Sequence, residues 1–159
     1  MYAAFFIGIV LIYVPARLLS WTGVSCPAKF ELQQIAGAIL GGFGGIIALW
    51  CILIFVLDGN GTPAPFDPPR QLVVKGPYRY VRNPMYLSAV LALAGAALFW
   101  DAWSLLVYVM LFLLATHLFV VLYEEPILRR SFGQKYEDYC RRVGRWWPHI
   151  GRQHDPGNA

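Results

Sequence analysis

Two clusters of polar residues stand at the ends of long apolar runs, where polar groups are costly unless they have partners or a task. The first cluster combines guanidinium, amide and phenol groups, and its members are Tyr78, Arg79, Tyr80, Arg82, Asn83 and Tyr86. The second is Tyr123-Glu124-Glu125. Cationic and amide donors suit an anionic ligand group, and carboxylates suit a cationic one. The two clusters therefore predict the two halves of one binding site.

The first cluster ends at a predicted helix start. Asn83 is a preferred N-cap residue and Pro84 is tolerated in the first turn, so this pair predicts where the helix begins. The free amides and positive dipole end of that helix favour an anionic group such as a carboxylate. Arg79 and Arg82 add charge of the same sign, although such arginines also serve simply as cytoplasmic anchors.

The adjacent Glu124 and Glu125 are either solvated residues at a helix end or ligands for a cation. Consecutive helical positions point about 100° apart. One glutamate can therefore bind a ligand while the other holds structure, and the sequence does not say which.

The elements that carry these clusters are those of a membrane protein, because 58% of the 159 residues are hydrophobic and only 14% are charged. Four apolar runs approach the roughly 17 to 25 residues that a membrane-spanning helix needs, at 2–19, 35–57, 85–100 and 103–123. The sequence predicts an all-α, polytopic membrane protein with four transmembrane helices in one membrane-embedded domain, 1–159.

The basic residues predict the orientation of these spans. Eleven of the thirteen lie between the second and third runs or after the fourth, namely Arg70, Lys75, Arg79, Arg82, Arg129, Arg130, Lys135, Arg141, Arg142, Arg145 and Arg152. Positive residues are retained on the cytoplasmic side. We therefore expect both termini, and a cofactor region made of 59–84 and 124–148, at the cytoplasmic face.

The third and fourth runs are predicted to form a hairpin that brings the two polar clusters together. The segment from Phe99 to Trp103 is typical of a tight turn at the far interface. From this turn, Pro84 and Glu124 lie about 26 and 35 Å away along ideal helices. Arg82, Asn83 and Tyr86 can then face Glu124 or Glu125.

Two further patterns concern packing. The repeat Gly37-x-x-x-Gly41-x-x-x-Gly45 predicts close helix approach, either to a neighbouring span or to a second copy in a homodimer. After the fourth run, apolar residues at spacings of three and four predict one C-terminal amphipathic cytoplasmic helix, and they are Leu128, Phe132, Tyr136, Tyr139, Cys140 and Val143.

The cysteines and histidines predict no metal site or disulfide framework. Cys26, Cys51 and Cys140 lie in different segments, and the three histidines form no pair with the spacing of metal ligands. His117 is expected to be buried and hydrogen-bonded.

The chain from about 59 to 148 resembles a family of integral membrane enzymes, the isoprenylcysteine carboxyl methyltransferase and phospholipid methyltransferase group. The shared residues, in order, are Leu72, Val73, Gly76, Pro77, Tyr78, Arg79, Arg82, Asn83, Pro84, Tyr86, Glu124, Glu125, Phe132, Gly133, Tyr136, Tyr139, Trp147 and Pro148. Enzymes of this family use S-adenosylmethionine to methylate lipid or lipidated acceptors at the cytoplasmic membrane face.

The resemblance implies the cofactor-binding residues of this chain. They are Arg70, Gln71, Leu72, Val73, Gly76, Tyr78, Arg82, Asn83, Pro84, Met85 and Tyr86, with Glu124 or Glu125 closing the pocket. The carboxylate of S-adenosylmethionine suits the helix start and its ammonium suits a glutamate.

The acceptor and the base stay open. A carboxylate acceptor needs no general base, whereas an amine must lose a proton, for which Tyr86, Glu124 and Glu125 are the candidates. Asn83 stands where the eukaryotic isoprenylcysteine enzymes have histidine, and valines 120 and 121 stand where they have an arginine. The isoprenylcysteine carboxylate and a phospholipid amine are therefore both possible acceptors.

Two other classes are alternatives. Membrane sterol-type reductases share the C-terminal tyrosines and bind NADPH, but the chain has no Gly-x-Gly-x-x-Gly motif. The other alternative is a non-catalytic helical membrane subunit, in which the polar clusters are anchors only.

Overall fold

The computed structural model of the chain describes residues 7–24, 27, 29–58 and 72–148. Regular structure in this part of the chain is helical, which confirms the all-α prediction. The elements are a π-helical turn η1 (Ile9–Tyr13), α2 (Val14–Trp21), α3 (Leu32–Asp58), a 3-10 helix η2 (Gly76–Arg79), α4 (Pro84–Phe99), α5 (Trp103–Phe119), a π-helical turn η3 (Val120–Glu124), α6 (Glu125–Phe132) and α7 (Gln134–Arg142).

Two continuous helical stretches are long and apolar enough to cross a membrane, Leu32–Ile54 with 23 residues and Trp103–Phe132 with 30 residues. They coincide with the second and fourth predicted runs. Only 17% and 22% of the residues in their most apolar windows are buried, unlike the core helices of a soluble protein. The helices at the first and third runs, Ile9–Trp21 and Pro84–Phe99, are shorter.

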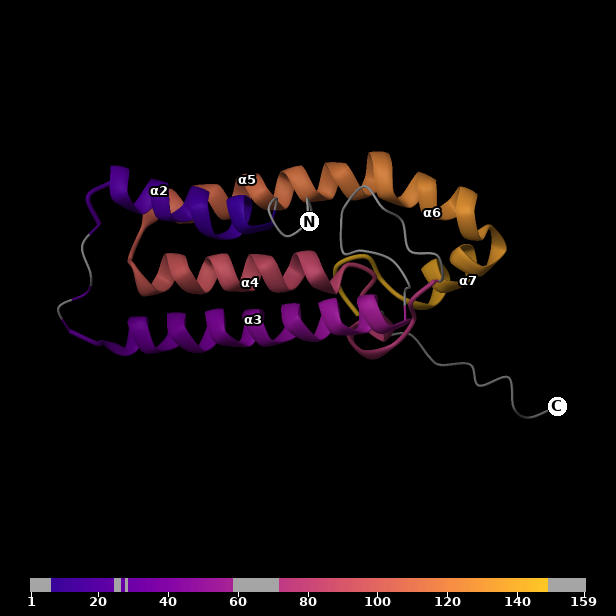
Figure 1. Cartoon of the computed structure of the whole chain (residues 1–159), viewed down its shortest axis with the longest axis horizontal. Coiled ribbons are helices and arrows are strands. Elements are labelled where there is room, and N and C mark those ends of the chain that lie inside the picture. Colours follow the sequence, from indigo (N-terminus) through magenta and orange to yellow (C-terminus); the bar gives the residue numbers. More distant parts are fainter. Residues whose placement is uncertain (1–6, 25–26, 28, 59–71, 149–159) are drawn as a thin grey trace.

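Helices α2 to α5 lie side by side along one long axis, and successive helices run in opposite directions (Figure 1). The far end holds the connection between α4 and α5, where Asp101 adopts a φ of 48°. The Gln33 amide donates there to the carbonyl oxygen of Leu98 at 3.1 Å and to the carboxylate of Asp101 at 3.0 Å. The predicted turn is confirmed, and it sends the start of α4 and the end of α5 to the same end of the molecule.

The glycines of α3 pack against α4. A Cβ atom on Gly37 would lie 2.5 Å from the backbone nitrogen of Phe99, and one on Gly44 would lie 2.6 Å from that of Ala92. Gly41 faces Gly95. Gly45 has open space instead, so the predicted stripe is wrong at its third member, which is Gly44. The neighbouring span thus occupies the face formed by Gly37, Gly41 and Gly44.

The helix that begins at Trp103 changes register before the site. In η3 the amide of Glu125 donates to the carbonyl of Val120, five residues back instead of four. Such single π-helical turns insert one extra residue into an α-helix. The turn therefore rotates Glu124 and Glu125 relative to the preceding helix.

The region after the fourth run contains two short helices where the sequence predicted one. Gly133 adopts a φ of 52° and separates α6 from α7. This left-handed φ is easily reached by glycine and interrupts a helix. The apolar residues of the predicted stripe still meet, because Tyr136, Tyr139 and Val143 form a buried cluster with Leu128, Phe132, Cys140 and Leu72 around it.

Candidate functional site

The segment 72–83 enters the site between two hydrophobic clusters. Val73 and Tyr78 are buried against Cys51 of α3, with Met85 beside them. Leu72 packs on the opposite side, in the cluster of α7. Because its side chains pack into both clusters, the path of this irregular segment between the helices is fixed by side-chain packing.

Gly76 allows the segment to pass close to α3. Its φ is 54°, and a Cβ atom there would collide with the Cδ1 methyl of Ile54. The positive φ therefore favours glycine, and a larger residue would also require the Ile54 methyl to move. The role that the resemblance implies for Gly76 in cofactor binding stays a prediction.

A hydrogen bond joins the 3-10 helix η2 to α7. The Tyr139 hydroxyl donates to the Tyr78 carbonyl oxygen at 2.6 Å. Burial raises the pKa of both phenols well above their ordinary values. Both stay protonated at neutral pH and act as donors or apolar surface rather than bases.

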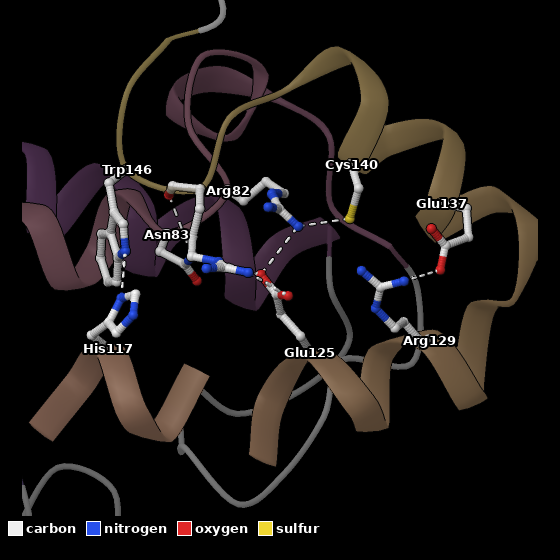
Figure 2. Close-up of polar contacts among 9 residues, drawn as sticks. Arg82, Asn83, His117, Glu125, Arg129, Glu137, Cys140 and Trp146 are labelled. Carbon is white, nitrogen blue, oxygen red and sulfur yellow. Dashed lines mark hydrogen bonds and ion pairs between the residues drawn. The ribbon is translucent and has the colours of Figure 1, made fainter. Parts of the chain in front are cut away.

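Glu125 is the centre of a buried ionic network (Figure 2). The residue as a whole is 5% exposed, and its carboxylate accepts two hydrogen bonds from the Arg145 guanidinium, at 2.7 and 2.9 Å. The Nη1 atom of Arg82 lies 3.2 Å from the same carboxylate. The Glu125 hydrogen bond raises the pKa of Arg145, so that guanidinium stays charged. Two cations thus hold one glutamate.

Glu124 has a different environment. The Tyr86 hydroxyl donates to its carboxylate at 3.2 Å. Within the described residues no arginine or lysine forms an ion pair with this partly buried carboxylate. The two adjacent glutamates therefore have different partners, as their consecutive positions in a helix allowed. Glu125 is bound by cations, and Glu124 accepts a hydrogen bond from a hydroxyl.

The start of α4 is fixed by the segment 143–146. The amide of Arg82 donates to the Gly144 carbonyl at 2.9 Å, and Val81 and Gly144 form an isolated parallel bridge. Asn83 occupies the predicted N-cap position but its side chain does not cap the helix. The side-chain amide of Asn83 donates instead to the Arg145 carbonyl oxygen at 3.4 Å. The helix start is confirmed, and the prediction of an asparagine cap is wrong.

His117 lies beside the same segment. It is exposed rather than buried as predicted, but it is hydrogen-bonded, because the Trp146 indole donates to its Nδ1 atom at 3.1 Å (Figure 2). Among the described residues no group of three histidine, cysteine or acidic side chains could hold a metal ion.

The structure brings two pairs of the predicted site residues together. Arg82 meets Glu125 and Tyr86 meets Glu124, as the hairpin geometry predicted. Arg70 and Gln71 lie outside the described residues. The sequence interpretation missed Arg145 as a partner of Glu125. Arg145 is one of many basic residues that follow the fourth run, and its spacing from Glu125 does not distinguish it from the others.

The arrangement has a defined chemical capacity. The first amides of α4 have no acceptor within the helix, which makes this terminus suited to an anionic group. Glu124 offers a carboxylate to a cationic group. A molecule that carries both charges therefore fits the chemistry of this donor set.

One comparison with known proteins identifies a family. Residues 32–135 match the family model described as phospholipid methyltransferase, which includes α3, the segment 72–83, α4, α5 and both glutamates. No curated protein and no solved structure matches the chain. Because the match spans more than half of this helical membrane protein, the chain belongs to the phospholipid methyltransferase family.

Proposed function

We propose that this membrane methyltransferase uses S-adenosylmethionine and transfers its methyl group to the amine of a phospholipid headgroup. The observation that carries the proposal is Glu124, a partly buried carboxylate that accepts from Tyr86 and has no cationic partner among the described residues. A carboxylate of this kind suits a positively charged ligand group or an amine that must lose a proton.

The residues present fit the methyl donor. The amides at the start of α4, next to Asn83 and Pro84, would receive its carboxylate, and Glu124 would receive its ammonium. Leu72, Val73 and Tyr78 supply apolar surface nearby. When bound, S-adenosylmethionine supplies an electrophilic methyl group on a sulfonium centre.

The chain itself contributes positioning and proton handling. An ammonium headgroup must be deprotonated before its nitrogen can attack, and the geometry favours Glu124 as the proton acceptor. Glu125 is less suited because both of its carboxylate oxygens already accept from Arg145, and Arg82 lies 3.2 Å from one of them. The Tyr86 hydroxyl donates a hydrogen bond to Glu124 and so orients that carboxylate. Packing of the segment 72–83 fixes these groups before any ligand arrives.

The same proposal includes the topology. We propose four spans in one domain, 1–159, with both termini and the site at the cytoplasmic face. The alternating directions of α2 to α5 support an even number of crossings (Figure 1). Exposed Trp21 and Trp103 mark the far end and exposed Trp147 marks the site end, as interfacial tryptophans do.

The acceptor class follows from the family and the residues together. A phospholipid amine is favoured over an isoprenylcysteine carboxylate because the family model that matches the chain is described as phospholipid methyltransferase. The family match does not support the NADPH reductase or the non-catalytic subunit. Homodimerisation through α3 stays a prediction, and Gly42 and Gly45 are the glycines of that helix with open space.

Two measurements test the proposal. Purified protein is expected to bind S-adenosylhomocysteine and not NADPH in equilibrium titrations. Membranes that contain the protein and a radiolabelled methyl donor are expected to label an ethanolamine phospholipid, identified by thin-layer chromatography. Binding without lipid labelling would keep the cofactor and reject the acceptor, and absence of binding would reject the proposed activity.

A further inference from the structure

We infer that Arg145 is a positioning residue for the methyl-donor site, acting through Glu125, Arg82 and Asn83. This inference rests on the proposed function. Arg145 lies beyond the residues that match the family model, which end at 135, and no implied cofactor-binding residue comes from the segment 143–146.

The first argument is the balance of charge around Glu125. Arg145 makes a two-pronged contact with this carboxylate, and Arg82 makes a single one at 3.2 Å. The side chains of Glu125 and Arg82 are only 7% and 11% exposed. Without Arg145, the Glu125 carboxylate would lose both hydrogen bonds of the two-pronged contact, and a buried acceptor left without its donors is costly. Among the described residues, Arg82 would then be the one cation left beside Glu125, and it would be drawn further toward that carboxylate.

The second argument is the position of Arg82 within the chain. Its guanidinium also donates to the Cys140 sulfur, and its backbone amide is tied to Gly144 (Figure 2). Arg82 directly precedes Asn83 and the first turn of α4. A shift of Arg82 would therefore move the amides that we propose for the carboxylate of the methyl donor.

The third argument is the direct link from Arg145 to that turn. The backbone carbonyl of Arg145 accepts a hydrogen bond from the side-chain amide of Asn83, and the guanidinium of Arg145 donates to Glu125. One residue thus connects the start of α4 with the start of α6. The start of α4 carries the anion-binding side of the proposed site, and Glu124, on the cation-binding side, directly precedes α6. Arg145 therefore sets the separation between the two sides.

The contacts also indicate that Arg145 does not act on the reacting groups. It bonds to Glu125, whereas the proposed proton acceptor is Glu124, whose hydrogen-bond donor is Tyr86. Its role is to hold geometry. Misplacement of binding groups by about 1 Å can lower an enzyme's rate about 100-fold, so a large effect at a distance is physically reasonable.

The experiment uses the full-length protein in detergent with S-adenosylhomocysteine as the probe. Arg145→Gln is expected to weaken binding about 10- to 100-fold. Arg145→Lys keeps the charge without the two-pronged contact and should recover part of the affinity. Arg142→Gln is the matched control, since it removes the same charge from an exposed residue whose guanidinium contacts only the Asp138 carbonyl among the described residues. It should bind like the wild type.

A double-mutant cycle tests whether Arg145 acts through Glu125. If it does, Glu125→Gln combined with Arg145→Gln should lose less affinity than the product of the two single losses. Single losses that multiply in the double variant would overturn the inference, as would binding by Arg145→Gln within twofold of the wild type. If Arg145→Gln does not fold, the same cycle with Arg145→Lys in its place decides. Absence of binding by the wild type would overturn the proposed function itself, and the inference with it.

Discussion

Two neighbouring glutamates have distinct tasks in this protein because their surroundings differ. Glu125 has two cationic partners, and Glu124 has a tyrosine hydroxyl. The sequence predicted that one would bind and one would support, but not which. That choice depends on the π-helical turn η3 and on Arg145, and neither leaves a recognisable pattern in the sequence.

The same amide substitution at the two glutamates should therefore have different effects. Glu124→Gln is expected to weaken S-adenosylhomocysteine binding about 10-fold or more, because it removes a charged contact, with little change in thermal stability. Glu125→Gln is expected to lower the free energy of unfolding by about 2–3 kcal/mol, because two guanidinium groups lose their carboxylate. Titration calorimetry and thermal unfolding measure the two quantities, and each variant is the control for the other. Equal effects of both variants on both quantities would contradict this division.

Tyr86 provides a second test at this scale. Tyr86→Phe keeps the ring and removes the hydroxyl that donates to Glu124. Hydrogen bonds to charged groups contribute about 1.5–3 kcal/mol, so the methyl-transfer rate should fall about 10-fold or more. Tyr80→Phe is a suitable control because Tyr80 is exposed. An unchanged rate in Tyr86→Phe, measured with the radiolabelled donor, would remove Tyr86 from the proposed site.

At the scale of elements, the pairing of α3 with α4 was predictable as close packing but not in its detail. The contacting glycines are Gly37, Gly41 and Gly44. At about 100° per residue, a position seven residues on lies about 20° from the first, whereas a position eight residues on lies about 80° away. The four-residue repeat therefore drifts off the contact face, which explains why Gly45 is open. The break at Gly133 was missed because glycine within a helical pattern does not by itself specify a positive φ.

Alanine substitutions at adjacent glycines test this packing. Gly44→Ala would bring a methyl group against the backbone of α4 and is expected to destabilise the fold by about 1–3 kcal/mol. Gly45→Ala meets open space and should be neutral or slightly stabilising, because alanine favours helices. Thermal unfolding in detergent compares the two. A larger loss for Gly45→Ala would show that α3 packs through the other face, as in a homodimer.

At the scale of the whole molecule, composition and helix lengths were sufficient to predict a helical membrane protein. The distribution of basic residues predicted the orientation of its spans in the membrane, which stays a proposal. How the last segment returns to the helix hairpin was not predictable. The contacts of Gly144 with Arg82 and of Trp146 with His117 join residues that are far apart in the chain. Only the folded chain brings them together.

The proposed orientation is open to direct measurement. Reporter fusions made in a bacterial host should give active alkaline phosphatase when inserted at the turn after Phe99, and a fluorescent cytoplasmic reporter when placed after Pro148. The opposite result at both sites would invert the topology. Phosphatase activity at both sites would indicate that the segment between them does not cross the membrane.

The dependence of the α4 start on Gly144 and Arg145 has a consequence for where the chain can be cut. A polypeptide that lacks these two residues would keep the sequence of every predicted span and still lose the ties that hold this helix end. Membrane insertion and assembly of the proposed site are therefore separable events.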